Sequence, residues 1–140
     1  MAIVIRACRE EDFPSLIAVW KAVGLTLGAS DTPEELSRLL QRNPDTCLVL
    51  EEDGLIKGGV MGGFDGRRGL VHHLAVSSES QGRGYGRALM EVLDARYRQM
   101  GVVKYSFWIE ADNANAVEFY LHLGYELRDL VTMSKTLIHE

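Results

Sequence analysis

Residues Leu70 to Arg87 read LVHHLAVSSESQGRGYGR and form the most informative segment of the chain. Its first part, up to Val76, is apolar and bounded by turn residues, which is typical of a strand. A polar spacer follows, and the glycine-rich run Gln81 to Gly86 then opens a helix. Glycines let the backbone come close to a ligand, and the N-terminus of a helix offers unpaired amides and a partial positive charge. With Arg83 and Arg87, the segment predicts a pyrophosphate site.

Three kinds of pyrophosphate loop compete for this run. A Walker loop needs Gly-Lys-Ser/Thr, which is absent. A dinucleotide fingerprint needs GxGxxG placed tightly after a strand, whereas this chain has GxGxG after a polar spacer. A third pattern, Q/R-x-x-G-x-G/A, is matched in every fixed position by Gln81, Gly84 and Gly86. The plain alternative is a glycine-rich turn that caps an ordinary helix.

The elements around this stretch follow from periodicity and turn signals. Asp53-Gly54 and Asp65-Gly66 separate apolar runs and predict antiparallel hairpins. The expected fold class is α/β: one domain over residues 1–140, with a mixed, mostly antiparallel central sheet and helices on both faces. The expected order is β-α-α-β-β-β-α-β-α-β, with strands at 3–7, 46–51, 55–64, 70–76, 104–109 and 127–137, and helices at 13–20, 33–40, 82–100 and 114–123.

Composition narrows the class of protein. The 140 residues are 46% apolar and 25% charged, the balance of a soluble globular protein. A net charge of −5 argues against nucleic-acid binding, and no apolar run is long enough for a membrane span. Cys8 and Cys47 are isolated, which favours two buried free thiols and no metal site. The start, MAIVIRACREEDF, has no basic leader, so we expect a cytoplasmic protein.

A second motif lies towards the C-terminal end. The segment AVEFYLHLGYE, close after Asn113, resembles the closing signature N-x-x-A-x-x-x-Y-x-x-x-G-F/Y of the GCN5-related N-acetyltransferases (GNAT). Its fixed places are filled by Asn113, Ala116, Tyr120, Gly124 and Tyr125. The opening IVIRACREEDFPSLIAVW resembles the family's first strand and helix, and Leu74-Ala75-Val76 stands where the family has LAV before the glycine loop. The chain is similar to the small bacterial members of the YpeA and ribosomal-protein-alanine types.

This resemblance implies the acyl-CoA N-acyltransferase fold and direct transfer of acetyl from acetyl-CoA to a primary amine of a small molecule, peptide or protein N-terminus. Pantetheine would lie between the strands at 70–76 and 104–109 and pair with the backbone of Leu74 and Val76. The amide of Leu74 would also bind the acetyl carbonyl. The family's dimers, which form through edge strands or the last strand, allow a homodimer. The residues that the resemblance assigns to coenzyme binding are Leu74, Ala75, Val76, Gln81, Gly82, Arg83, Gly84, Tyr85, Gly86, Arg87 and Asn113.

The same resemblance assigns Tyr120 as the general acid beside the coenzyme sulfur, the alternative being a packed core tyrosine. The base stays open, because Trp108 holds the place of the glutamate that some family members use. Glu110 would share a face with Trp108 in a regular strand. His72 falls where serotonin N-acetyltransferase has a strand histidine and titrates near neutrality. His73 would point to the opposite face from His72, and solvent is a further acceptor of the proton.

For the amine pocket, the resemblance implies the loop 22–32 and the hairpin at 64–68. Apolar lining could come from Trp20, Leu25, Leu27 and Phe64, each of which is equally well explained as a core or loop residue. Two other functions compete with the enzyme. One is an idle CoA-binding sensor without a positioned base, and the other is a Rossmann-type nucleotide-binding domain.

Overall fold

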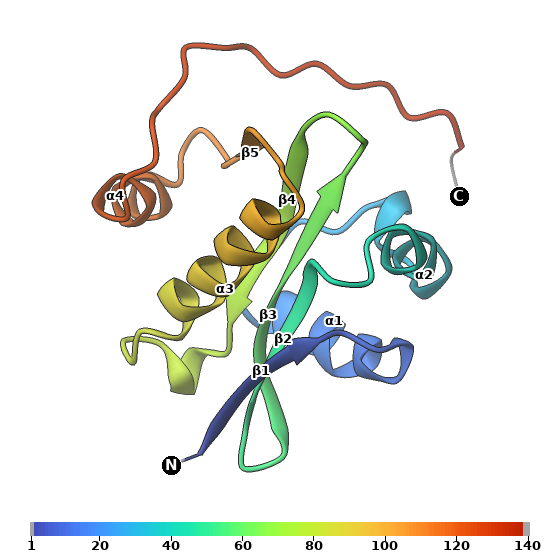
Figure 1. The fold of residues 1–140 in the computed structure, drawn as a ribbon, viewed down its shortest axis with the longest axis vertical. Helices are drawn as coiled ribbons and strands as arrows, with labels where there is room; N and C mark the ends of the chain where they lie inside the picture. Colours follow the sequence, from blue (N-terminus) through green and yellow to red (C-terminus); the bar gives the residue numbers. More distant parts are fainter. Residues whose placement is uncertain (1, 139–140) are drawn as a thin grey trace. The chain divides into compact units, whose positions relative to one another are not determined.

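The computed structural model describes residues 2–138, which divide into two compact units, one ending at Phe107 and one beginning at Trp108 (Figure 1). The first unit is a five-stranded sheet with three helices. Its strands are β1 (Ile3–Ala7), β2 (Cys47–Glu52), β3 (Leu55–Phe64), β4 (Gly69–Val76) and β5 (Tyr105–Phe107). Its helices are α1 (Phe13–Ala22), α2 (Pro33–Arg42) and α3 (Tyr85–Gln99), with 3-10 turns η1 (Glu10–Asp12), η2 (Ala29–Asp31) and η3 (Ser78–Ser80).

The strands lie in the order of the sequence, β1-β2-β3-β4-β5. The first four pair antiparallel, and hairpin turns at Asp53-Gly54 and Asp65–Arg68 join β2 to β3 and β3 to β4. Only β5 runs parallel to its neighbour β4. The expected mixed, mostly antiparallel sheet is therefore confirmed. A Rossmann-type reading is wrong for this chain, because a doubly wound parallel sheet has no such meander.

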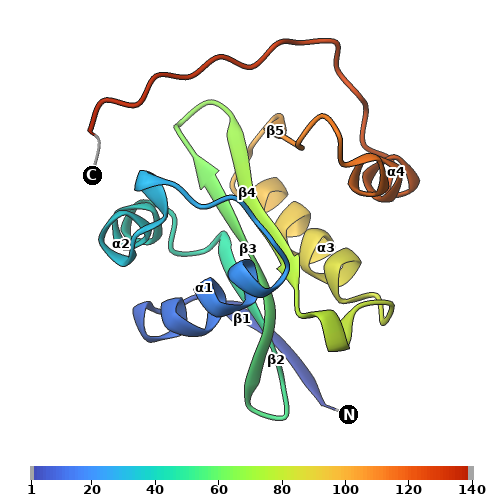
Figure 2. The ribbon, with the colours of Figure 1, turned by 180° about the vertical axis from the view of Figure 1, so that it is seen from behind.

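Helices cover both faces of this sheet, with α1 and α2 on one face and α3 on the other (Figure 2). Two glycines of β3 set how closely they approach. A Cβ added at Gly59 would lie 2.7 Å from Leu16 of α1, and one at Gly62 would lie 2.6 Å from Leu93 of α3. The apolar core on the α1 side includes Trp20 and Met61, both at 1% exposure or less.

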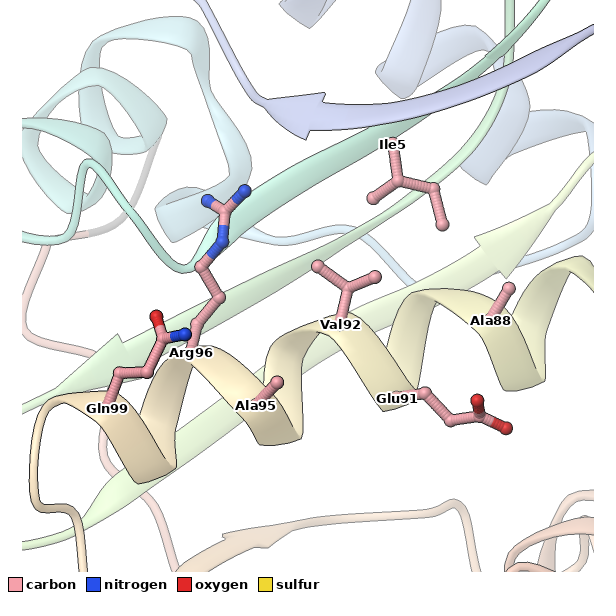
Figure 3. Close-up of a pocket in the computed structure, with 7 residues that line it drawn as sticks. All are labelled: Ile5, Ala88, Glu91, Val92, Ala95, Arg96 and Gln99. Carbon is pink, nitrogen blue, oxygen red and sulfur yellow. The ribbon is translucent and has the colours of Figure 1, made fainter.

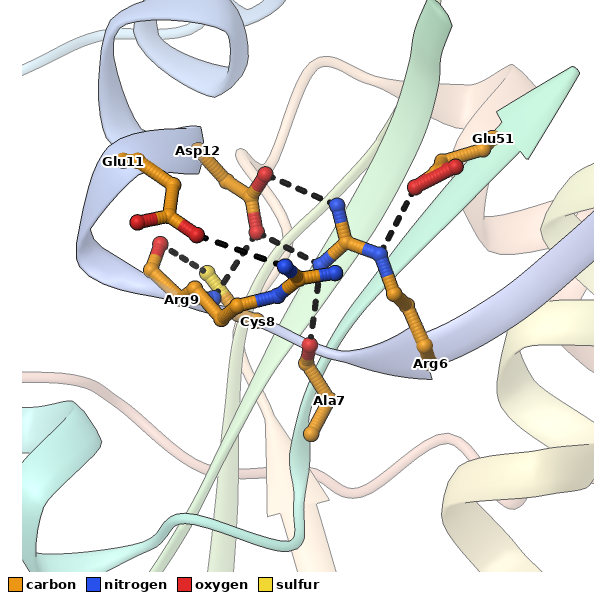
Figure 4. Close-up of polar contacts among 7 residues, drawn as sticks. All are labelled: Arg6, Ala7, Cys8, Arg9, Glu11, Asp12 and Glu51. Carbon is orange, nitrogen blue, oxygen red and sulfur yellow. Dashed lines mark hydrogen bonds and ion pairs between the residues drawn. The ribbon is translucent and has the colours of Figure 1, made fainter. Parts of the chain in front are cut away.

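A polar network closes the start of the first unit (Figure 4). The guanidinium of Arg6 donates to both carboxylate oxygens of Asp12, at 2.8 and 2.9 Å, and to Glu51 at 2.7 Å. Asp12 is buried and also accepts from the amide of Arg9 at 2.8 Å. Hydrogen bonding to Arg6 holds the pKa of Asp12 below its usual value. The network fixes β1 to the start of α1.

Both cysteines are free and buried, as the sequence predicts. Burial raises the pKa of the Cys8 and Cys47 thiols to about 12, so neither is a nucleophile at neutral pH. No helix within residues 2–138 combines the length and the apolar character that crossing a membrane requires.

The second unit contains one helix, α4 (Ala114–His122), and an extended segment after it. The expected last strand at 127–137 is wrong, because residues 123–138 form no strand or helix. Its apolar side chains, such as Val131 and Met133, are about nine-tenths exposed. A strand needs backbone partners, and this segment's alternating apolar pattern cannot supply them by itself. The strand expected at 104–109 is also shorter, since β5 ends at Phe107.

Candidate functional site

A bulge in β4 determines where the two histidines point. Gly59 pairs with Ala75 but Met61 pairs with His72, so one residue of β3, Val60, opposes two residues of β4. The extra residue is His73, whose φ of 54° lies in the left-handed region. The pairing of β3 with β4 is regular on either side of the bulge. The shift of one residue at the bulge reverses which side chains of β4 face α1 and which face α3.

Both histidines consequently lie on the face covered by α1. His72 is paired with Met61, which belongs to the core on that face. The ring of His73 packs on Trp20 of α1, with centroids 4.7 Å apart, and the centroids of the two imidazoles are 6.4 Å apart. The expectation that His73 points away from His72 is wrong, because strict alternation fails at a bulge. Burial lowers the pKa of His72, and the neighbouring His73 lowers it further.

Beyond the bulge, one edge of β4 has no strand partner within residues 2–138. The ladder with β5 ends at the pair Val71–Phe107, while β4 continues to Val76. The amide of Ser77 donates to the carbonyl oxygen of Lys57 in β3 at 2.7 Å. Along a regular antiparallel strand, successive residues direct their backbone groups to opposite edges. The backbone groups of Val76 therefore face the other edge, where the pairing with pantetheine is predicted, whereas Leu74 lies within the bulge, where regular alternation fails.

The glycine loop lies directly after this edge. The side-chain amide of Gln81 donates to the carbonyl of Val76 at 3.0 Å, which joins the loop to the strand. Gly82 and Gly84 have φ near 80°, and a Cβ at either would meet no atom within 4 Å. The backbone there is open to a ligand. Helix α3 begins at Tyr85 rather than at Gly82, because left-handed residues cannot continue a right-handed helix.

The charges of the loop are already paired within the first unit. Arg83 lies 3.2 Å from Glu52, and Arg87 lies 3.0 Å from Glu91 one turn along α3. Glu52 is buried at the end of β2 and also accepts a hydrogen bond from the phenol of Tyr85 at 2.5 Å. Sequence reasoning missed Glu52, because a carboxylate in a hairpin strand resembles any exposed strand-end acid.

An acid–imidazole pair lies on the other side of the sheet. Nε2 of His73 is 2.7 Å from Oδ1 of Asp31, which comes from η2 in the loop between α1 and α2. The second oxygen of Asp31 accepts from the amide of Gly28 at 2.8 Å, so both carboxylate oxygens are used. Sequence reasoning did not single out Asp31, because it directly precedes Thr32, whose side chain caps α2, and is easily taken as part of that helix start.

The remaining predicted residues belong to the second unit. The side chain of Asn113 accepts from the amide of Ala116 at 3.1 Å and caps α4. Tyr120 packs edge-on against Tyr125, with centroids 5.6 Å apart, and burial raises the pKa of its phenol. Glu110 is exposed in the loop after β5, so the inference that it shares a strand face with Trp108 is wrong.

A groove of about 360 Å³ lies elsewhere, between β1 and α3 (Figure 3). Because β1 and β4 are separated by two strands, this groove is remote from the open edge of β4. Among residues 2–138, no three His, Cys, Asp or Glu side chains gather in a way that could hold a metal ion. The groove is lined by Ile5, Ala88, Glu91, Val92, Ala95, Arg96 and Gln99.

Comparison with known proteins gives three kinds of likeness. The sequence profile of the acetyltransferase (GNAT) family matches residues 6–125. An acetyltransferase of Pectobacterium atrosepticum is 35% identical over 136 residues, which cover 97% of this chain and 96% of that protein.

Two solved structures share the fold at low sequence identity. The PaiA N-acetyltransferase of Thermoplasma acidophilum, in complex with coenzyme A, has a TM-score of 0.81 at 19% identity and covers 94% of each chain. The ribosomal-protein-S18-alanine N-acetyltransferase of Escherichia coli has a TM-score of 0.74 at 19% identity, covering 88% of this chain and 77% of that one.

Proposed function

The chain belongs to the acetyltransferase (GNAT) family, and from this premise we propose that it transfers acetyl directly from acetyl-CoA to a primary amine of a small molecule or of a peptide or protein N-terminus. The observation that carries the proposal is the end of β4. The backbone groups of Val76 there face an edge without a strand partner within residues 2–138, and the loop that follows has two open left-handed glycines.

The residues of the loop fit the coenzyme. A pyrophosphate is held well by successive amides at a helix N-terminus, and α3 is long enough to carry a substantial dipole. Missing side chains at Gly82 and Gly84 leave the close approach that a phosphate needs. Arg83 and Arg87 would contribute charge, and Tyr85 and Gly86 begin the helix. The proposal takes Asn113 as a further contact to pantetheine.

Transfer of the acetyl group needs three contributions from the protein. The amide of Leu74 would donate to the acetyl oxygen, which becomes negative as the amine attacks. The amine must first lose a proton, because an ammonium has no lone pair. As the C–N bond forms, the C–S bond breaks, and Tyr120 would give a proton to the departing thiolate. No acyl-enzyme is proposed.

For the proton of the amine, the sequence offers His72 and Glu110. The lowered pKa of His72 keeps its imidazole neutral at neutral pH and also weakens it as a base. Glu110 lies exposed in the loop after β5, where water competes with an amine for its carboxylate. Each has a physical handicap for this role.

A CoA-release assay tests the function. The purified protein is given acetyl-CoA and a panel of polyamines, amino acids, aminoglycosides and peptides, and the free thiol is measured. We expect release with at least one class of amine and mass spectrometry to find the acetylated product. Binding of acetyl-CoA without release for any amine would favour the idle sensor instead.

Three coarser properties complete the proposal. Residues 1–140 would form one N-acetyltransferase domain, since the match to the family runs across the junction at Phe107. A cytoplasmic location is supported by the two buried free thiols. The partner is an amine substrate, and a homodimer stays compatible with the proposal.

A further inference from the structure

The geometry points to a third group for the amine's proton: we propose that His73 is the general base and that Asp31 is its positioning residue. This inference rests on the proposed function and assigns a step that the sequence left open. It starts from a contact between residues that are 42 positions apart, the 2.7 Å hydrogen bond between Nε2 of His73 and Oδ1 of Asp31.

The hydrogen bond decides which nitrogen can act. A carboxylate can only accept, so Nε2 carries the proton and donates it to Asp31. The lone pair of the neutral ring is then on Nδ1, which is the atom that takes a proton from an ammonium. The resulting imidazolium is stabilised by the carboxylate beside it.

The residues that contact the imidazole of His73 are themselves held in place by the fold. The second oxygen of Asp31 accepts from the amide of Gly28, and the side chain is only 13% exposed. Trp20 packs against the imidazole from α1, and its buried Nε1 has no hydrogen-bond partner within residues 2–138. A polar ligand could accept a hydrogen bond from this buried indole N–H, which belongs to the ring that packs on the imidazole.

The position along the chain fits the reaction. His73 directly precedes Leu74, whose amide the proposed function assigns to the acetyl oxygen. The bulge places the imidazole on the α1 face, next to the loop that the family resemblance assigns to the amine. The titratable groups that the ring faces are Asp31 from η2 and His72 from β4, while α1 contributes the uncharged Trp20.

The step balances as follows. The ammonium R–NH3⁺ gives one proton to Nδ1 of His73 and becomes R–NH2. Its nitrogen attacks the acetyl carbon and the C–S bond breaks. Tyr120 gives its phenol proton to the thiolate, and the second proton of the nitrogen, passed through solvent, restores the phenol. The products are the amide and CoA–SH, and His73 releases its proton to solvent.

The test uses variants that keep the backbone. His73 has a positive φ, which asparagine tolerates, and its amide can still donate to Asp31. His73→Asn, Asp31→Asn and the control His122→Asn, an exposed histidine of α4, are assayed with spermidine, kanamycin and an alanyl tripeptide. We expect kcat/KM of His73→Asn at pH 7 to fall by about 10²-fold or more and its rise with pH to lose its inflection. For Asp31→Asn we expect a smaller loss with the inflection moved to lower pH, and for the control no change.

Chemical rescue distinguishes a general base from a residue whose role is only structural. Glycine also accepts a positive φ, so His73→Gly should recover activity when imidazole is added, while Asp31→Asn should not. Folded variants with the wild-type pH profile, or with lower melting temperatures alone, would overturn the assignment of His73. If the wild-type protein binds acetyl-CoA but releases no CoA with any amine of the full panel, the proposed function fails, and this inference fails with it.

Discussion

The phenol oxygen of Tyr85 lies 2.5 Å from Oε2 of Glu52, and both side chains are buried. This contact joins the first turn of α3 to the last residue of β2 and thereby holds the glycine loop between them. The same carboxylate lies 3.2 Å from Arg83. One buried acid of a hairpin strand thus positions two residues of the predicted pyrophosphate loop.

The contact predicts a cost for removing the charge. Glu52→Gln keeps an acceptor for Tyr85 but leaves Arg83 without a carboxylate, and we expect it to lower the free energy of unfolding by about 1–3 kcal/mol. Urea denaturation measures the change. Tyr85→Phe should cost less, and the double variant should cost less than the sum of the two, because Glu52→Gln weakens the hydrogen bond that Tyr85→Phe removes. Strict additivity would show that the two side chains are not coupled.

The glycine loop predicts a difference between two nearly identical variants of Gly84. Its φ of 80° suits asparagine better than most residues, and a side chain there enters open space. Gly84→Asp adds a negative charge at the proposed phosphate position, whereas Gly84→Asn adds the same shape without charge. In excess acetyl-CoA, the melting temperature should rise for the wild type and clearly less for Asn, and should not rise for Asp. An equal rise for both variants would rule out this loop as the phosphate site.

The role of Tyr120 predicts a loss of turnover without a loss of binding. Tyr120→Phe should keep the wild-type affinity for acetyl-CoA and lower kcat by roughly 10²-fold or more. Since burial raises the pKa of this phenol above its ordinary 10.0, the wild-type kcat should show no fall from its ionisation up to pH 10. Stopped-flow release of CoA measures both quantities. Wild-type turnover in the phenylalanine variant would make Tyr120 a packing residue.

If either His72 or Glu110 is the base, its substitution should change the pH profile of kcat/KM. If His72 were the base, kcat/KM would rise with pH through an inflection below 6.5, since its pKa is lowered, and His72→Ala would remove that inflection. Glu110→Gln would act in the same way if the carboxylate were the base. We expect the double variant to keep the rising limb, because His73 remains. Loss of the limb in either single variant returns the role to that residue.

The network around Asp12 predicts acid sensitivity. Because Arg6 lowers the pKa of Asp12 below 3.8, its stabilising effect is complete above that pH and is lost as the pH falls through the depressed folded value. Asp12→Asn should cost about 2 kcal/mol at pH 7 and progressively less below pH 4. Unfolding free energies measured across this range should converge for the two proteins. A constant difference would exclude the ionised carboxylate as its cause.

Several features could be predicted from the sequence because their causes are local. A glycine that needs a positive φ, a turn dipeptide between two apolar runs, and a loop next to a helix N-terminus all depend on neighbouring residues. The hairpin turn at Asp53-Gly54, the open glycines of the loop and the mixed sheet are of this kind. The expected strand at 127–137 is absent from the structure, because a strand depends on backbone partners that its own residues do not provide.

Other features of the site could not be predicted, because they depend on pairing between segments that are distant in the sequence. The bulge at His73 arises from a change of register between β3 and β4, which neither strand carries alone. That change places His72 and His73 on one face and lets Asp31, 42 residues away, reach the ring. The partners of Glu52 are likewise set by how α3 packs on β2. The sequence alone was therefore enough for the family, the mixed sheet and the glycine loop, whereas only the packing of distant segments brought His73 to Asp31 and Tyr85 to Glu52.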